Sequence, residues 1–194
     1  MDTEADRTRR GPWTTEEWLE LNEASDGNRY ELLDGSLLVS PPPSNYHQYV
    51  ADSLVAALRA AVPEGLRVIS AVGARLSTGT IFIPDIVVMT ESGFDSTPPT
   101  DTAEVRLVVE VVSPSSTSKD RVLKPAKYAA AGVPHYWRVE LENSPELGPD
   151  DKPPVILAYV LDASAYRLVS KMSAGTRGVL PAPFEFDPAD LLSP

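Results

Sequence analysis

Two acidic residues stand inside otherwise apolar runs of this sequence. Glu110 interrupts the run Arg106–Val112, and Asp85 follows a proline in the run Ile81–Met89. Side chains alternate along a strand, and the first run is apolar on both faces apart from Glu110, which indicates a buried strand. An ionised carboxylate there is costly unless it meets a cation, a metal or several donors. The alternatives are an edge strand with Glu110 in water and, for Asp85, a turn at a strand end.

The proline before Asp85 has no backbone N–H, so the strand is expected to bend or to end its pairing there. A distorted strand can direct one carboxylate into a cleft. Two carboxylates from two apolar strands make a hard, oxygen-rich site suited to Mg²⁺ or Mn²⁺, and without a cation their repulsion raises one pKa. Asp85 and Glu110 together therefore predict a divalent metal site.

A helix expected at about 118–131 carries three polar residues on one face. Asp120, Lys124 and Tyr128 are spaced by four, so they share that face. A lysine beside a metal-bound water can orient it or stabilise developing negative charge, whereas the alternative is an exposed Asp120–Lys124 pair worth about 0.3–0.5 kcal/mol. Pro125 is costly inside a helix, so the helix is expected to be kinked or to begin later.

Two further residues have a possible place in the site. Glu31 shares a face of an expected strand with Leu33, and is either another acid of the site or a solvated strand residue. His47 stands at the N-terminal end of the apolar stripe of a helix, where a core or rim histidine is an alternative to a catalytic one.

The elements expected to position these residues alternate between strands and helices. A crossover of strand, helix and strand over 106–140 is expected to be right-handed and parallel. The pattern predicts an α/β fold with a mixed β-sheet flanked by helices. Its expected parts are a helix from Thr14 or Thr15 to about Asn22, a hairpin at 30–39 turning at Asp34-Gly35, a helix from the cap Ser44 to Val62, strands within 66–89, a loop at 91–104, strands at 106–112 and 135–140, a loop at 142–154, a hairpin at 155–171 and a short helix near 187–192.

Composition limits the class of protein. A chain of 194 residues fits one domain, expected over 14–194 behind a flexible tail at 1–13. No apolar run approaches the length of a membrane span, and the acidic N-terminus lacks the apolar core of a signal peptide, so we expect a cytoplasmic protein. Without cysteine, and with only His47 and His135, any metal must be held mainly by oxygen. The net charge of −11 opposes steering toward phosphate backbones.

Several blocks of the sequence, taken in order, resemble the Uma family of putative restriction endonucleases, within the PD-(D/E)XK nuclease-like superfamily. The likeness covers about residues 14–170. The blocks are Tyr30-Glu-Leu-Leu-Asp-Gly, Ser40-Pro41 followed by His47, Pro84-Asp85-Ile-Val-Val, Glu110-Val-Val-Ser-Pro-Ser, Asp120 with Lys124 and Tyr128, and Ala131-Gly-Val-Pro-His-Tyr-Trp137.

The resemblance implies a restriction-endonuclease-like core in which Asp85 and Glu110 bind a divalent metal. The superfamily pattern places a lysine two positions after the second acid, but Val112 stands there. The resemblance instead makes Lys124, on the helix, the candidate lysine. Glu31 resembles the additional N-terminal acid of the superfamily. His47 falls on a recurring position without an assigned role, and Asp120 and Tyr128 are candidates for supporting contacts.

These inferences predict a Mg²⁺- or Mn²⁺-dependent endonuclease that hydrolyses DNA phosphodiester bonds. Asp85, Glu110 and the backbone carbonyl of Val111 would ligate the metal, Glu31 would complete its coordination, and Lys124 would position the attacking water. Two alternatives are a nuclease-fold binding or regulatory module without activity and a hydrolase of another phosphate substrate. Because small nucleases often act as pairs, we expect a homodimer with the hairpin at 155–171 as its interface.

Overall fold

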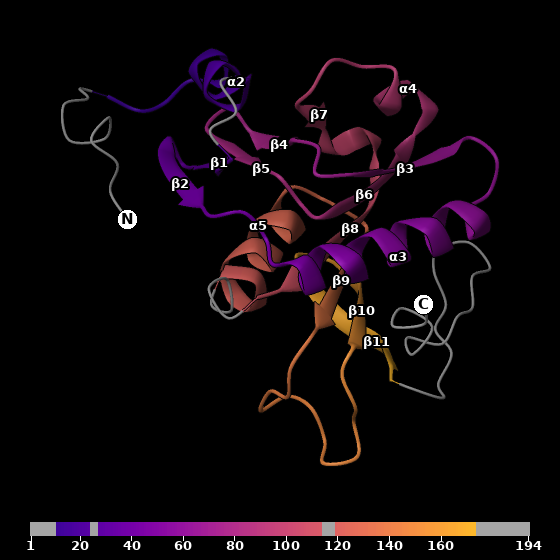
Figure 1. Ribbon diagram of the computed structural model, residues 1–194. Helices are drawn as coiled ribbons and strands as arrows, with labels where there is room; N and C mark the ends of the chain where they lie inside the picture. The colour runs from indigo at the N-terminus through magenta and orange to yellow at the C-terminus, as the bar shows by residue number, and fades with distance from the viewer. Residues whose placement is uncertain (1–10, 24–26, 114–118, 174–194) are drawn as a thin grey trace.

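The strands of this protein divide between two mixed sheets (Figure 1). The computed structural model describes residues 11–23, 27–113 and 119–173. One sheet has the order β2-β1-β5-β4-β7, and the other has the order β11-β10-β9-β8-β6-β3. Helices lie against both sheets, which confirms the predicted α/β class, but the strands form two mixed sheets where a single mixed sheet was expected.

The five-stranded sheet begins with the predicted hairpin. Asp34 and Gly35 form its turn with φ angles of 50° and 80°, a region that glycine and aspartate tolerate. The neighbouring β5 pairs with β1 through Leu32 and Ile81. The strands of this sheet are β1 (Arg29–Leu33), β2 (Ser36–Ser40), β4 (Ala74–Ser77), β5 (Thr80–Phe82) and β7 (Thr100–Asp101).

Helix α2 (Thr15–Glu23) packs on this sheet. It begins with a capping box, in which the Thr14 backbone N–H donates to Glu17 Oε2 at 2.9 Å and the Glu17 N–H donates to Thr14 Oγ1 at 3.3 Å. Trp18 is buried beneath the helix and its Nε1 donates to the carbonyl of Tyr30 at 2.7 Å. Helix α2 therefore holds the strand β1, which carries two residues of the site described below.

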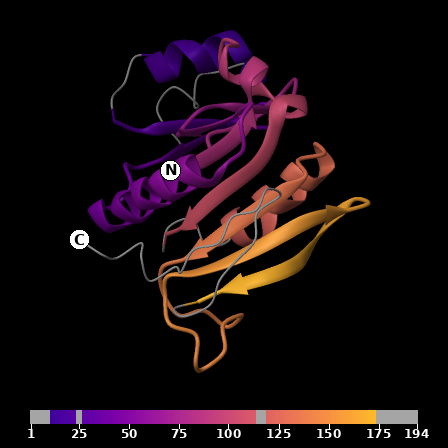
Figure 2. The same cartoon turned by 90° about the vertical axis from the view of Figure 1, so that its right-hand side faces the viewer.

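The six-stranded sheet contains the predicted parallel crossover. Its central strand β8 pairs antiparallel with β6 and parallel with β9. The hairpin expected at 155–171 is also present, as β10 and β11 at one edge (Figure 2). The strands are β3 (Leu66–Ser70), β6 (Ile86–Thr90), β8 (Val105–Val112), β9 (His135–Glu140), β10 (Val155–Asp162) and β11 (Ala165–Met172).

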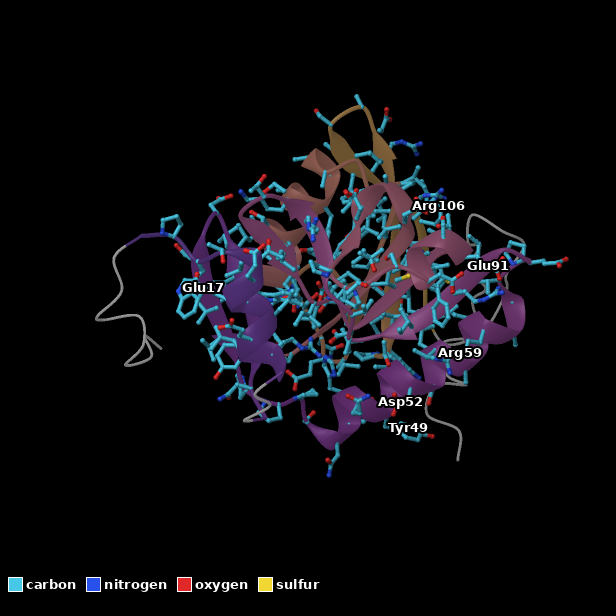
Figure 3. The ribbon with its side chains drawn as sticks, turned by 90° about the horizontal axis from the view of Figure 1, so that it is seen from above. Glu17, Tyr49, Asp52, Arg59, Glu91 and Arg106 are labelled. Carbon is cyan, nitrogen blue, oxygen red and sulfur yellow. The ribbon has the colours of Figure 1, made fainter. Side chains whose placement is uncertain are left out.

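Helix α3 (Asn45–Ala61) covers one face of the six-stranded sheet. Ser44 caps it by accepting a hydrogen bond from the His47 backbone N–H at 3.2 Å. Tyr49 and Asp52 lie on its outer side (Figure 3). Its apolar side forms a core with alternate residues of the strands, including Val50, Leu54, Leu58, Val88, Leu107, Val109 and Trp137.

The opposite face of the six-stranded sheet packs against α5 (Lys124–Ala130) and the five-stranded sheet. A π-helical turn, η2 (Lys119–Leu123), precedes α5, and Pro125 stands in the first turn of α5, where its missing N–H costs little. The helix therefore begins later than its polar spacing alone indicates, as the proline predicted. The core on this face includes Phe82, Val87, Val108, Tyr128, Val133 and Tyr136.

One local expectation is confirmed and one needs correction. The run Ile81–Met89 is interrupted as expected, because Pro84 and its neighbours separate β5 from β6. The stretch 91–104, expected to be a loop, contains the helix α4 (Glu91–Phe94), β7 and a 3₁₀ turn, η1 (Thr102–Glu104). The short helical turns in this stretch form because polar caps, such as the Thr90 hydroxyl accepting from the Gly93 N–H at 3.1 Å, stabilise single turns in sequences without helical periodicity.

The helix expected near 187–192 and most of the tail expected at 1–13 lie outside the described residues. Of the latter, Trp13 donates its backbone N–H to the carbonyl of Gly35 at 2.8 Å. The division into tail and domain stays a prediction. Among the described residues, no helix is long and apolar enough to cross a membrane.

Candidate active site

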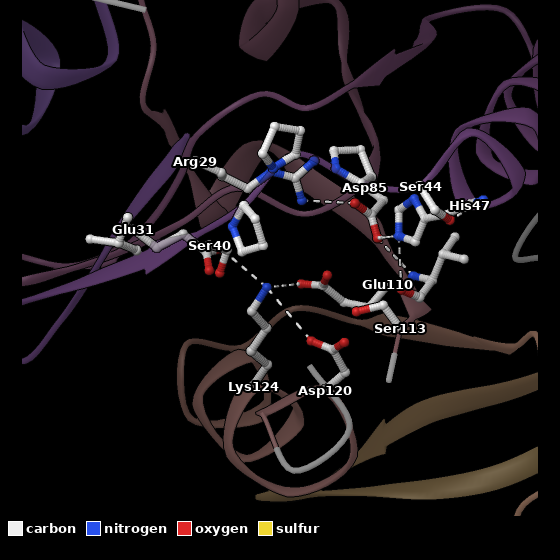
Figure 4. Close-up of a pocket in the computed structure, with 15 residues that line it drawn as sticks. Arg29, Glu31, Ser40, Ser44, His47, Asp85, Glu110, Ser113, Asp120 and Lys124 are labelled. Atoms are coloured by element: carbon white, nitrogen blue, oxygen red, sulfur yellow. Dashed lines mark hydrogen bonds and ion pairs between the residues drawn. The ribbon is translucent and has the colours of Figure 1, made fainter. Parts of the chain in front are cut away.

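A cavity of about 370 Å³ lies where β1, the start of α3, the end of β8 and the start of α5 meet (Figure 4). Its walls come from both sheets. Among the described residues, four carboxylates, two permanently charged cations and one imidazole line it, namely Glu31, Asp85, Glu110, Asp120, Arg29, Lys124 and His47. Apolar and small residues of the segment after β2, including Pro41, Pro42, Pro43 and Ser44, complete the rim.

Asp85 occupies the break between β5 and β6. The β6–β8 register pairs Ile86 with Val109, so its continuation by one residue places Asp85 opposite Glu110. The free end of β6 lets the Asp85 side chain turn to the end of β8, where Oδ2 accepts from the Val111 N–H at 2.8 Å. The sequence analysis expected such a distortion from Pro84.

Two cationic or polar side chains contact the Asp85 carboxylate. Arg29 Nη1 lies 2.8 Å from Oδ1, and His47 Nε2 lies 3.2 Å from Oδ2. Burial opposes ionisation of Asp85, but the His47 hydrogen bond and the Arg29 charge outweigh it and lower its pKa to about 2. Asp85 is therefore ionised at neutral pH.

Glu110 lies on an internal strand and is 1% exposed, which excludes the edge-strand alternative. Its Oε1 accepts from Lys124 Nζ at 3.0 Å and from the Tyr128 hydroxyl at 2.7 Å. Burial raises the pKa of Glu110 well above its usual range; Lys124 opposes that effect, while Asp120, Asp85 and Glu31 add to it. The main cause of this rise is burial, and repulsion from Asp85, which the sequence predicted as the cause, makes a smaller contribution.

Lys124 joins three acidic side chains. Its Nζ lies 3.0 Å from Glu31 Oε1, 3.0 Å from Glu110 Oε1 and 3.8 Å from Asp120 Oδ1. Burial alone lowers the pKa of a lysine, but Glu110, Glu31 and Asp120 outweigh it and raise the pKa of Lys124. The Asp120–Lys124 pair is buried, so its exposed alternative is wrong.

Glu31 is buried on the cavity side of β1, so its solvated alternative is also wrong. Its Oε1 accepts from the backbone N–H of Ile83 at 2.7 Å, besides its contact with Lys124. Glu31 thereby joins the first hairpin both to the break before β6 and to α5.

His47 projects from the first turn of α3 into the cavity. Its Nε2 lies 2.9 Å from the Val111 carbonyl oxygen and 3.2 Å from Asp85 Oδ2, so we assign the ring proton to Nε2. Burial lowers the pKa of His47, but its hydrogen bond with Asp85 outweighs that effect and raises it. The Val111 carbonyl and the Asp85 carboxylate thus face one common donor.

Tyr128 and Tyr136 donate hydrogen bonds to two of the acidic residues, Tyr128 to the Glu110 carboxylate and Tyr136 to the Asp120 backbone. The Tyr136 hydroxyl donates to the Asp120 backbone carbonyl at 2.6 Å, and Tyr128 contacts Phe82 in an edge-to-face arrangement with ring centroids 5.6 Å apart. Burial raises the pKa of both tyrosines well above their usual range, so both hydroxyls remain donors.

The structure brings together every residue that the sequence analysis selected, since Glu31, His47, Asp85, Glu110, Val111, Asp120 and Lys124 line one cavity and Tyr128 contacts Glu110. Their roles stay predictions. Arg29 was missed. Its position two residues before Glu31 could have indicated it. Alternate residues of a strand share a face, so a site that includes Glu31 can also include Arg29.

The donor set suits a hard divalent cation, because its nearest atoms are carboxylate and carbonyl oxygens. Asp85 Oδ2 and the Val111 carbonyl oxygen both contact His47 Nε2. These two oxygens therefore lie close enough together to face one N–H donor, as they would face a cation. Among the described residues, however, no three acidic or histidine side chains converge closely enough to hold an ion as they stand. The residues fit such an ion by chemistry, and in this structure the carboxylates of Asp85 and Glu110 contact Arg29, His47 and Lys124.

A mixed sheet flanked by helices, with a buried acidic cavity at the ends of β6 and β8, defines a restriction-endonuclease-like fold. The chain matches the Uma2 family, described as putative restriction endonuclease, over residues 15–174, and it therefore belongs to that family of nucleases. Its structure is similar to that of a putative nuclease from Anabaena variabilis ATCC 29413, with a TM-score of 0.64 at 17% identity over 94% of this chain and 98% of that one. No curated protein matches the chain.

Proposed function

We propose that this protein is a Mg²⁺-dependent endonuclease that hydrolyses DNA phosphodiester bonds. One observation carries the proposal. Asp85, just before β6, and Glu110, on the antiparallel neighbour β8, face one cavity together with the Val111 carbonyl and Lys124. Membership of a nuclease family supports the reaction class.

Asp85, Glu110 and the Val111 carbonyl would hold Mg²⁺ or Mn²⁺, with Glu31 as a further acid. A bound divalent ion supplies charge for the scissile phosphate and increases the acidity of water. His47 would keep Asp85 oriented through the contact of its Nε2 with Oδ2.

Lys124 is the group suited to hold the attacking water. It is charged, buried and fixed by Glu31, Glu110 and Asp120, so its position does not depend on solvent. An ammonium hydrogen-bonded to the water oxygen orients the nucleophile and stabilises the charge that develops as its proton leaves. The Tyr128 hydroxyl keeps the Glu110 carboxyl in a single orientation.

The proposal is tested with single- and double-stranded DNA and with Mg²⁺ or Mn²⁺, followed on gels and by calorimetric metal titration. The variants are Asp85→Asn and Glu110→Gln, which keep side-chain shape, and the control is Asp162→Asn, an exposed hairpin residue outside the cavity. We expect cleavage by the wild type and the control, and loss of at least about 100-fold in both site variants. Intact DNA, with unchanged metal binding in Asp85→Asn, would overturn the proposal.

The two alternatives give different results in the same experiment. A binding module without activity is favoured by the pairing of Asp85 and Glu110 with internal cations, and it predicts no Mg²⁺ titration at the carboxylates. A hydrolase of another phosphate substrate predicts activity on bis(4-nitrophenyl) phosphate but none on DNA. The net charge of −11 is the observation that favours this second alternative.

The predicted homodimer remains a proposal. Leu168 and Val169, on the edge strand β11, are 48% and 45% exposed, and they would lie in the interface expected at 155–171. Sedimentation of the full chain at several concentrations tests it, and Leu168→Ser is the variant expected to give monomers. A wild-type monomer at all concentrations would exclude the dimer.

A further inference from the structure

Arg29 stands on the Asp85 side of the cavity, at the start of β1, and its side chain is 23% exposed. Nη1 donates to Asp85 Oδ1 at 2.8 Å and to the Ile83 carbonyl at 3.3 Å. These two contacts fix one corner of the guanidinium against the break that carries Asp85 (Figure 4).

These two contacts use only the Nη1 donors of Arg29. A guanidinium has five N–H donors, of which two belong to Nη1 and three to Nε and Nη2. Among the described residues, none accepts a hydrogen bond from Nε or Nη2 of Arg29. Arg29 therefore retains a pair of adjacent donors, held in one plane, in a side chain that lines the cavity.

Lys124, the other permanent cation of the cavity, differs in this respect. An ammonium has three donors. Lys124 Nζ lies 3.0 Å from Glu31 and 3.0 Å from Glu110, and Asp120 is 3.8 Å away. Lys124 can therefore hold a water but has no second donor open to a phosphate. A substrate anion would have to compete with those acids for Lys124. Arg29 contacts one carboxylate, so it can accept a second anion without losing the first.

The charge of the cavity favours such a contact. Among the described residues, four carboxylates face two permanent cations, a formal charge of −2 that one divalent ion only brings to zero, so an entering phosphate finds no excess of positive charge. A guanidinium binds two phosphate oxygens through parallel N–H donors, which an ammonium cannot do.

We propose that Arg29 binds the phosphate of the substrate, through Nε and Nη2, while Nη1 holds Asp85. This inference rests on the proposed function, because it assumes that a phosphate enters the cavity. Arg29 then couples the metal-ligand carboxylate to the substrate, on the side of the cavity opposite Lys124.

The test measures phosphate binding and metal binding separately. Inorganic phosphate is titrated by calorimetry into wild type, Arg29→Lys and Arg29→Gln with saturating Mg²⁺, and Mg²⁺ is titrated without phosphate. The control is Arg67→Lys, an exposed arginine that pairs with Glu91 outside the cavity. Arg29→Lys keeps a positive charge beside Asp85, so it should fold and bind Mg²⁺ within about threefold of the wild type.

We expect Arg29→Lys to weaken phosphate binding at least about 10-fold, and Arg29→Gln to weaken it further. On bis(4-nitrophenyl) phosphate, kcat/KM of Arg29→Lys should fall roughly 100-fold, whereas Arg67→Lys should be unchanged. Unchanged phosphate affinity in Arg29→Lys would overturn the inference, as would a loss that merely follows weakened Mg²⁺ binding. A wild type that binds phosphate through Arg29 but cleaves no diester would overturn the nuclease proposal and leave this inference intact.

Discussion

At the scale of single residues, one oxygen atom, Glu110 Oε1, connects several side chains of the site. Glu110 Oε1 accepts from both Lys124 and Tyr128, in a place with almost no water. A buried charge whose partner is removed costs far more than the intact pair contributes. The stability of the protein and the geometry of the site are therefore linked at Lys124.

Lys124→Met should lower the free energy of unfolding by about 3 kcal/mol or more, because it leaves Glu31, Glu110 and Asp120 without their shared cation. Urea denaturation measures the loss. The double variant Lys124→Met/Glu110→Gln should recover part of it, since one of the uncompensated acids is then neutral. Additive effects of the two substitutions would contradict this account.

Tyr128→Phe should cost about 1–2 kcal/mol, because Glu110 loses one of its two donors while the ring remains packed against Phe82. Urea denaturation checks this value. Tyr46→Phe is a matched control, because Tyr46 is exposed and should change stability by only a few tenths of a kcal/mol. Equal effects of the two substitutions would show that the Tyr128 hydroxyl contributes nothing.

Most of the candidate site could be predicted at this scale, and the reason is chemical. Asp85 and Glu110 are conspicuous because a carboxylate in an apolar run needs an explanation. Arg29 is not, since a basic residue at the start of a strand is ordinary, and its role depends on an aspartate 56 positions away. The three contacts of Lys124 are likewise a product of the tertiary fold.

At the scale of elements, the site depends on how α2 supports β1. Gly73 lies against the ring of Trp18, and a Cβ there would be 2.5 Å from Trp18 Cη2. Gly73→Ala should therefore destabilise the protein by about 1–3 kcal/mol through overpacking, measured by thermal or urea unfolding. Gly148→Ala, where a Cβ meets only ordinary contacts, is the control. No difference between these variants would contradict the packing of α2.

The first hairpin is also joined to α5 by an ion pair. Asp34, at the turn, accepts from Lys127 Nζ at 2.7 and 2.8 Å. The hydrogen bond from Lys127, followed by that from Thr80, lowers the pKa of Asp34. A carboxyl with a lowered folded pKa stabilises the protein above its unfolded pKa of about 3.9, and that contribution is lost as the pH falls through the folded value.

Asp34→Asn should accordingly lower the melting temperature at about pH 7, and the difference from the wild type should shrink as the pH falls below the unfolded pKa of about 3.9 and vanish below the folded one. Asparagine tolerates the positive φ of this turn, so the comparison isolates the charge. Melting curves at several pH values measure it. A difference that stays constant with pH would show that the charge of Asp34 does not matter.

Local signals predicted the hairpins and the parallel crossover because a turn dipeptide and a capped amphipathic helix are encoded within a few residues. The division into two sheets could not be predicted in this way. It depends on β1 pairing with β5, through Leu32 and Ile81, which are far apart in the sequence. The short elements in 91–104 could not be predicted from hydrophobic periodicity either, because each contains too few residues for a pattern to repeat.

At the scale of the whole molecule, charge should limit how tightly DNA is held. With a net charge of −11, the surface repels a polyanion, so we expect a dissociation constant above about 1 µM at physiological salt. Mg²⁺ should strengthen binding by neutralising the acidic cavity. Fluorescence anisotropy of a labelled oligonucleotide, with and without Mg²⁺ and over a range of salt, checks both expectations. Tight binding without metal would contradict them.

The three contacts of Lys124 have a consequence for folding. Glu31, Glu110 and Lys124 are brought together from the first hairpin, the central strand of the other sheet and α5, so their cluster forms only when both sheets have docked. Contacts between such distant segments close late, after the local hairpins and helices. Metal affinity should therefore appear in the last phase of refolding, which makes bound Mn²⁺ a reporter of completed assembly.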